Sequence, residues 1–229
     1  MEAQELLNQI YYAYRGKGVS KVPAWGTEKA NLAIAIANRK MKEWARDPYH
    51  RWASLFEVRD LADPIDLAQF SYDLDTDLIA NSDYVFIVKT DDTRLEYPVV
   101  TPNKRNGNGQ CFYIAGRNPK QLVWATETID AGLDGATISL AGYYLPADLV
   151  EDDDVVAVDD PNWLVYITAA ELARNDPAKD DQFGNLVGQA NDLYQKMVAA
   201  NSFSGYLQPN AIEYSMPDIG GDGDGWGDM

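Results

Sequence analysis

The sequence has few of the side chains from which most active sites and metal centres are built. Its 229 residues include one cysteine, Cys111, and one histidine, His50. A single cysteine excludes an internal disulfide and a thiolate metal cage, and a single histidine excludes zinc motifs that need a histidine pair. Phosphate-binding glycine loops and the dinucleotide fingerprint are also missing. We therefore predict no catalytic residues, no bound metal and no cofactor, so the protein is not expected to be an enzyme.

Long apolar runs and basic residues are scarce as well. No segment approaches the roughly 18 apolar residues that span a bilayer, and the first residues lack the basic and apolar stretches of a signal peptide. We therefore expect a protein made in the cytosol, without membrane contact. The 19 Lys and Arg stand against 36 Asp and Glu, a formal charge of −17. A surface this acidic does not neutralise phosphates, which excludes nucleic-acid binding as the main function.

Helical patterns occupy both ends of the chain. Hydrophobic residues make up 46% of the sequence, and their spacing predicts helices over residues 6–14 and 27–47, which we expect to form an antiparallel hairpin. Towards the other end, Asp160 followed by Pro161 is a typical helix start. A longer helix is predicted to begin near Asp181.

The last predicted helix contains two glycines four residues apart, Gly184 and Gly188. Each costs about 1 kcal/mol relative to alanine inside a helix. Their spacing indicates a close approach to another helix, and early fraying of the helix is the alternative.

The centre of the chain has the period of β-strands from about Asp77 onwards. Residues 84–88 are apolar on both faces, which is typical of a fully covered strand, and residues 95–99 alternate as on an edge strand. Further strands are predicted over residues 111–114, 122–124 and 137–140. Asp134-Gly135 is a favourable hairpin turn between the last two. The centre is therefore expected to be a small antiparallel sheet or sandwich.

These patterns predict an α+β fold. The N-terminal and C-terminal helices form one helical bundle, with an inserted small antiparallel β domain and an extended C-terminal tail. We place the N-terminal helical part at residues 1–76, the β insert at 77–146, the C-terminal helical part at 147–201 and the tail at 202–229.

Candidate binding residues lie in the tail and in one loop. The tail is rich in Gly and Asp and is not expected to fold alone, so its large apolar side chains are candidate anchors to a partner. These are Tyr206, Leu207, Tyr214, Met216 and Trp226. Lys104 and Arg105 form a basic island in an Asn/Gly loop that could face an acidic partner, and ordinary solubilising charge is the alternative. The acidic run 151–154 is interpreted as a solvated loop, with a calcium site as the alternative.

One stretch of the sequence resembles a known family. Tyr143-Tyr144-Leu145-Pro146 leads to Asp159-Asp160-Pro161, and the final helices contain Ala169-Ala170-Glu171-Leu172 and Ala190-Asn191-Asp192-Leu193-Tyr194. Two helices, a β insert, two helices and a tail in this order resemble the head-to-tail adaptor (neck or connector) proteins of tailed bacteriophages. The similarity covers residues 2–201 in layout and is sharpest over residues 143–201.

The resemblance implies a structural virion protein that forms a homo-dodecameric ring. Such a ring docks beneath the portal protein, with tail or nozzle proteins below, and DNA passes through its channel without sequence-specific binding. The expected location is the virion neck, with the host cytoplasm during assembly, and the tail is expected to reach the portal. The alternative is a monomeric β-rich module of a virion or cell surface that presents Tyr113, Trp124, Tyr143 and Tyr144 to a carbohydrate.

Overall fold

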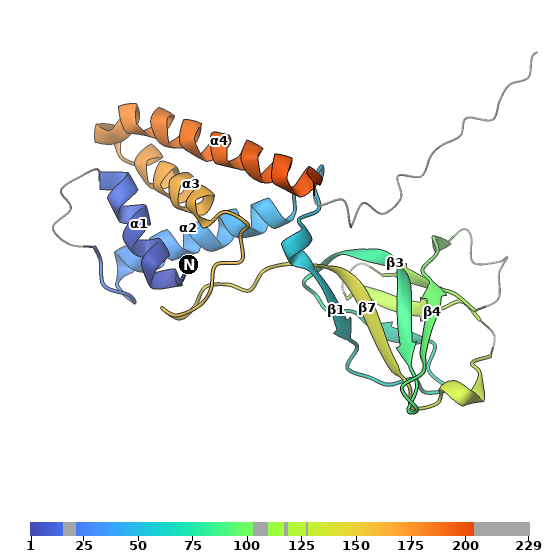
Figure 1. Cartoon of the computed structure of the whole chain (residues 1–229). Coiled ribbons are helices and arrows are strands. Elements are labelled where there is room, and N and C mark those ends of the chain that lie inside the picture. The colour runs from blue at the N-terminus through green and yellow to red at the C-terminus, as the bar shows by residue number, and fades with distance from the viewer. Residues whose placement is uncertain (16–21, 103–109, 117–118, 127, 204–229) are drawn as a thin grey trace, which may run out of the picture.

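The computed structural model describes residues 1–15, 22–102, 110–116, 119–126 and 128–203. The described residues form four α-helices and two antiparallel sheets, which confirms the predicted α+β fold. Figure 1 shows the helices gathered in one part of the molecule and the strands in another. Helices from the two ends of the chain lie together, and the strands come from the segment between them.

The four helices are α1 (Ala3–Arg15), α2 (Glu28–Ala45), α3 (Pro161–Arg174) and α4 (Asp180–Phe203). Each matches a predicted helix to within a few residues. The Asp160 carboxylate accepts the N–H of Asn162 at 2.9 Å and caps α3, as its position before Pro161 predicts. Thr27 precedes α2, but its hydroxyl donates to the carbonyl of Ala24 and does not cap the helix.

Helix α3 is the centre of the bundle. It packs against α1, α2 and α4, whereas α1 and α2 share only a small contact. The expected antiparallel hairpin of α1 and α2 is therefore not the main packing of these helices. Small side chains explain the difference, because Ala169, Ala170 and Ala173 are buried and let neighbouring helices approach α3 from several sides.

Seven strands form the two sheets. The four-stranded sheet has the order β1 (Phe56–Asp60), β7 (Thr137–Tyr144), β3 (Leu78–Val88) and β4 (Arg94–Pro98). The three-stranded sheet has the order β2 (Ser71–Asp73), β6 (Gln121–Trp124) and β5 (Phe112–Ala115). All pairings between strands of a sheet are antiparallel. Side chains from both sheets share one core, including Ile87, Ile138, Phe112 and Leu122, so the centre is a sandwich.

Two strands begin before the expected start of the β region at residue 77. Strand β1 alternates apolar and charged residues over only four positions, Phe56 to Arg59, and β2 has only three residues, so both give weak strand signals in the sequence. The hairpin predicted around Asp134-Gly135 is wrong, because β6 and β7 belong to different sheets. Gly135 does turn the chain, with φ of 74°, directly after a 3-10 turn at Ala131–Leu133.

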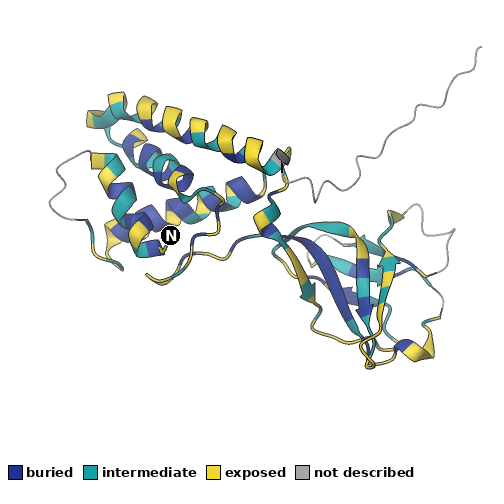
Figure 2. Ribbon diagram, in the orientation of Figure 1, coloured by how far each residue is buried: buried dark blue, intermediate teal, exposed yellow. Residues whose placement is uncertain are grey.

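Burial corrects two further expectations (Figure 2). Within residues 84–88, Val85 and Ile87 are fully buried, but Tyr84 on the other face is 46% exposed, so this strand is covered on one face only. Gly184 and Gly188 are exposed on α4, and a Cβ at either would meet nothing within 4 Å. The expected close helix approach at these glycines is therefore not formed within the described chain. Strand β4 is an edge strand, as predicted.

The helical and β parts have separate cores that meet on β7 and at the start of β3, where Leu78 belongs to the sandwich core and Ile79 packs against the bundle core. Adjacent side chains of a strand point to opposite faces, and Tyr143 of β7 belongs to the bundle core while Tyr144 belongs to the sandwich core. Tyr143 packs edge to face against Phe56 of β1, with ring centroids 5.3 Å apart. The end of the sheet thus packs directly against the bundle.

Candidate functional site

The junction between the bundle and β1 contains a cluster of aromatic rings. Trp52 stacks on Trp44 at 5.0 Å between centroids and meets the edge of Tyr194 at 5.8 Å. His50 stacks on Trp52 at 5.7 Å, and Trp163 lies 6.3 Å from Tyr194. These rings come from α2, α3, α4 and the loop after α2, so the cluster ties together segments about 110 residues apart in the chain.

Polar contacts fix the cluster. The hydroxyl of Tyr194 donates to Asp47 Oδ2, and His50 Nδ1 lies 3.2 Å from the same oxygen. Trp52 Nε1 donates to the carbonyl of Trp44 at 2.8 Å. His50 thus contacts aromatic rings and one carboxylate, and these contacts fix the orientation of its imidazole ring.

The end of α4 is held at the same junction. Asn201 accepts the N–H of Ala53 on Oδ1 at 3.2 Å and donates from Nδ2 to the carbonyl of Arg51 at 2.8 Å. One side chain therefore satisfies two backbone groups of the segment that leads into β1. The described part of the chain ends two residues later, at Phe203.

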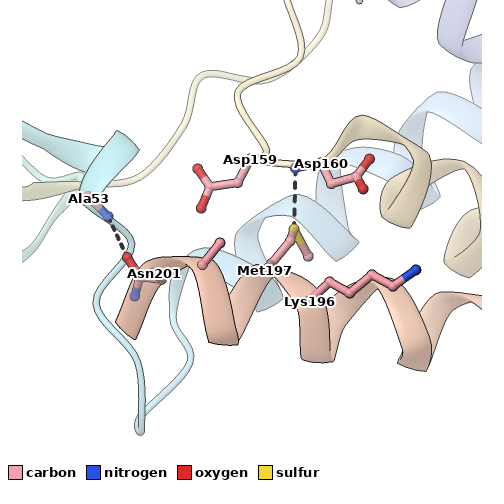
Figure 3. Close-up of a pocket in the computed structure, with 7 residues that line it drawn as sticks. Ala53, Asp159, Asp160, Lys196, Met197 and Asn201 are labelled. Carbon is pink, nitrogen blue, oxygen red and sulfur yellow. Dashed lines mark hydrogen bonds between the residues drawn. The ribbon is translucent and has the colours of Figure 1, made fainter. Parts of the chain in front are cut away.

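A groove of about 400 Å³ lies beside this contact (Figure 3). Met197 and Ala200 of α4 and Ala53 supply its apolar wall, and Asp159, Asp160 and Lys196 add charge. Met197 Sδ accepts the N–H of Asp160 at 3.3 Å, which joins α4 to the start of α3. The groove lies at the C-terminal end of α4.

A second groove, of about 330 Å³, lies between α2 and the sheet, with Lys42, Arg59 and Asp148 among its lining residues. Lys42 pairs with Asp148 at 2.7 Å. Arg59 lies 2.7 Å from Glu57 and 2.9 Å from Asp77, and its guanidinium covers the ring of Tyr144 at 3.8 Å.

Burial and charge shift two pKa values in this second groove. Burial alone lowers the pKa of Arg59, but its hydrogen bonds to Glu57 and Asp77 outweigh burial and raise it above its usual range. Burial raises the pKa of Tyr144 to about 12, partly opposed by Arg59. Both groups therefore keep a single protonation state near neutral pH, which suits a structural junction.

The residues predicted to bind a partner lie outside the described residues. This applies to the tail anchors Tyr206, Leu207, Tyr214, Met216 and Trp226 and to the loop residues Lys104 and Arg105. All four aromatic residues of the alternative sugar-binding surface are described, and Tyr113 on β5 is half-buried. Trp124, Tyr143 and Tyr144 are buried in the two cores, so their faces are not available to stack on a sugar.

The acidic run forms a defined loop. Asp154 Oδ2 accepts the N–H groups of Val150 and Glu151 at 2.6 and 2.8 Å. These backbone hydrogen bonds lower the pKa of Asp154. The carbonyls of Asp152 and Asp154 accept the N–H groups of Gln4 and Ala3, which attaches the loop to the start of α1.

The described part of the chain contains no group of three or more His, Cys, Asp or Glu side chains placed to hold a metal ion. Cys111 is buried, and burial raises the pKa of its thiol. In the same part of the chain, no helix combines the length and apolar character needed to cross a bilayer.

The sequence patterns missed an exposed loop after α2. Tyr49 is 88% exposed, the highest value among the described large hydrophobic residues that are exposed. Arg46 and Arg51 are exposed on either side of it. The only sequence signal is Pro48, which marks the end of α2 without indicating where the next side chain points.

Comparison with known proteins adds no relative. No family model matches the sequence, and no curated protein matches it. The function is therefore inferred from the residues and contacts of this chain.

Proposed function

We propose that the chain is a non-enzymatic structural subunit of a head-to-tail adaptor ring in tailed phage virions. In this role a ring of identical copies, twelve in the family it resembles, joins the portal protein above to tail or nozzle proteins below. DNA passes through the ring without sequence-specific binding. The protein resides in the virion neck, and in the host cytoplasm before assembly.

The architecture is the observation that carries this proposal. A bundle made from both chain ends, with an inserted β domain, matches the layout that the family resemblance implies. Such a bundle places the end of α4 and the start of β1 together, through Asn201 and Ala53. A C-terminal segment that starts there can reach a neighbouring protein while the bundle and the sandwich remain intact.

The chemistry of the junction fits an assembly role. Its aromatic rings and the Arg59 contacts are used for packing, and its grooves lie where the two parts of the molecule meet. The formal charge of −17 suits a channel through which DNA moves, because carboxylates repel phosphate at short range. Screening limits this repulsion to about 8 Å in physiological salt.

Mixing the protein with a phage portal protein tests the proposal. We expect ring-shaped complexes in negative-stain images, and a loss of portal affinity of at least about tenfold when residues 204–229 are deleted. Far-UV circular dichroism should change little, because the described helices and strands end at Phe203. The absence of any complex with the intact protein would contradict the proposal.

A matched pair of tail variants separates anchoring from charge. Replacing Tyr206, Tyr214 and Trp226 with alanine should reproduce most of the effect of the deletion, because buried aromatic anchors dominate interfaces. Replacing Asp222 and Asp224 with asparagine should have a much smaller effect. The reverse order would indicate that the tail binds by its charge.

A further inference from the structure

The loop after α2 presents an aromatic side chain between two cations. We name residues 46–51 the Tyr49 loop. Tyr49 is 88% exposed, and Arg46 and Arg51 are exposed as well. Tyrosine and arginine are enriched among the residues that dominate protein interfaces. An exposed Tyr between two Arg therefore has the composition of an interface centre.

Hydrogen bonds hold the Tyr49 loop in one conformation. Asp47 Oδ1 accepts the N–H of Tyr49 at 2.7 Å, and the carbonyl of Asp47 accepts from the Arg51 guanidinium at 3.3 Å. Asn201 binds the carbonyl of Arg51, and His50 stacks on Trp52. A loop fixed in this way loses little conformational entropy on binding, which favours association.

The distribution of charge along the chain indicates what the Tyr49 loop binds. The first 55 residues carry nine Lys and Arg against five Asp and Glu, a net charge of +4. The remaining 174 residues carry ten Lys and Arg and thirty-one Asp and Glu, a net charge of −21. A second copy of the same chain thus offers acidic surface to a loop from the basic segment.

The acidic loop, residues 150–155, has the features that complement the Tyr49 loop. Glu151, Asp152 and Asp153 are exposed, and they lie between Val150 and Val155, which are 66% and 71% exposed. The sequence contains no Lys or Arg from residue 121 to residue 173 that could neutralise these carboxylates locally. The two valines can pack against the ring of Tyr49, and the three carboxylates can pair with the guanidinium groups of Arg46 and Arg51.

We propose that the Tyr49 loop of one copy docks on the acidic loop of a second copy. The acidic loop lies against the start of α1, and the Tyr49 loop lies at the end of α2 near the sheet (Figure 1). A contact between two different surfaces of identical subunits is heterologous, so each copy can bind one neighbour on each side and a ring results where the rotation closes. This inference deepens the proposed adaptor ring and rests on it for its biological setting, although the contact itself follows from the two loops.

Charge reversal in the full-length protein tests the contact. Sedimentation equilibrium in about 0.05 M NaCl, up to about 1 mM protein, should show association that weakens as salt is raised. Arg46→Glu with Arg51→Glu, and separately Glu151→Lys with Asp153→Lys, should each weaken association at least about tenfold. The chain that carries all four changes should regain most of it, because the pairing is then reversed on both sides. Lys29→Glu, an exposed change elsewhere on α2, is the control and should have little effect.

Tyr49→Ala tests the aromatic contribution, with Tyr12→Ala as its control because Tyr12 is 55% exposed on α1. We expect Tyr49→Ala to weaken association about tenfold or more and Tyr12→Ala to leave it unchanged. A wild-type chain that stays monomeric at about 1 mM, or a four-change chain without rescue, would overturn the inference. Rings formed with the portal protein by a chain in which only one of the two loops is reversed would overturn it too, while leaving the proposed function standing. Association through the two loops without any binding to the portal protein would support the loop contact and contradict the proposed function.

Discussion

The bundle and the sandwich are assembled from the chain in different ways. The sandwich is built from one continuous segment, from β1 at Phe56 to the end of β7 at Tyr144. The bundle needs α1 and α2 from before that segment and α3 and α4 from after it. Closing the bundle therefore means ordering a long intervening segment, and contacts at the junction must offset that loss of entropy.

Large aromatic side chains are buried in both parts. Trp44 and Trp52 are buried at the junction of the bundle. In the sandwich core, Phe112 and Trp124 pack with ring centroids 4.3 Å apart, among aliphatic side chains such as Ile138. Each part thus has its own buried contacts, and a substitution in one core should destabilise that part first.

The largest expected effect is that of Trp52→Ala. Trp52 is fully buried, stacks on Trp44 and donates a hydrogen bond from its indole nitrogen. We expect a loss of about 3–5 kcal/mol in the free energy of unfolding, located in the bundle. Hydrogen exchange should show faster exchange in α2–α4 while amides of β3 and β7 stay protected.

Ile138→Ala is the control for this comparison because Ile138 is fully buried in the sandwich core. This substitution should lower the free energy of unfolding by about 2–5 kcal/mol, and the amides of the strands should be the first to exchange faster. If both variants raise exchange equally in the two parts, the molecule unfolds as one cooperative unit and the distinction between the parts is wrong.

Gly142→Ala should have the next largest effect. A Cβ at Gly142 would lie 2.7 Å from Leu78 Cδ1 and 2.8 Å from the carbonyl oxygen of Ala80. The backbone oxygen cannot move aside without disturbing the pairing of β3 and β7, so we expect a loss of about 1–3 kcal/mol. Urea unfolding monitored by circular dichroism measures it. Gly135→Ala is a useful contrast, because Gly135 has open space around its Cβ position but φ of +74°.

The sequence predicts the helices better than the sheet, for a physical reason. Helix α3 has a local start signal in Asp160-Pro161, and α4 has an apolar face that repeats every turn. Strand β1 has a much weaker local signal, because its apolar and charged residues alternate over only four positions, Phe56 to Arg59. Its place in the sheet is set by pairing with β7, about 80 residues away. Partners that distant in the chain cannot be identified from local propensity.

The candidate site shows the same limit. The sequence indicates that Asp47 and Tyr194 lie in or next to helices, but only the folded chain shows that they share a hydrogen bond. The exposure of Tyr49 depends on the turn made by Asp47, which a sequence pattern does not show. The anchors expected in residues 204–229 stay predictions, because they lie outside the described residues.

Asp160→Ala tests the start of α3, the helix on which the bundle is centred. The Asp160 carboxylate caps the helix through the N–H of Asn162. Losing a cap of this kind costs about 1 kcal/mol, which chemical denaturation can resolve. Asp160→Asn keeps an acceptor oxygen and should recover most of the loss. An equal loss for both variants would show that the negative charge, and not the hydrogen bond, stabilises the helix start.

Gly184→Ala and Gly188→Ala should stabilise the bundle slightly. Both positions are exposed in α4 with open space for a Cβ, so alanine should add up to about 1 kcal/mol each. Thermal unfolding of the isolated protein measures this gain. Reduced binding to other subunits, together with a more stable monomer, would indicate that the two glycines are used for close contact in an assembly.

A pH-dependent effect also distinguishes the two cores. Tyr144 faces the sandwich core, its hydroxyl donates to the carbonyl of Leu140, and its pKa is raised from 10.0 to about 12. The folded state therefore keeps this proton when the unfolded state has lost it, so the contribution to stability is complete below pH 10 and is lost as pH rises from 10 to 12.

Urea unfolding at pH 9 and pH 11 should thus show a larger loss of stability in the wild type than in Tyr144→Phe, because phenylalanine cannot ionise. Tyr143→Phe is the matched variant on the other face of β7, where burial also raises the pKa. Tyr143→Phe should also reduce the pH dependence, because a raised pKa in the folded state has the same consequence there. A wild type and a Tyr144→Phe variant that lose equal stability between pH 9 and pH 11 would contradict the prediction.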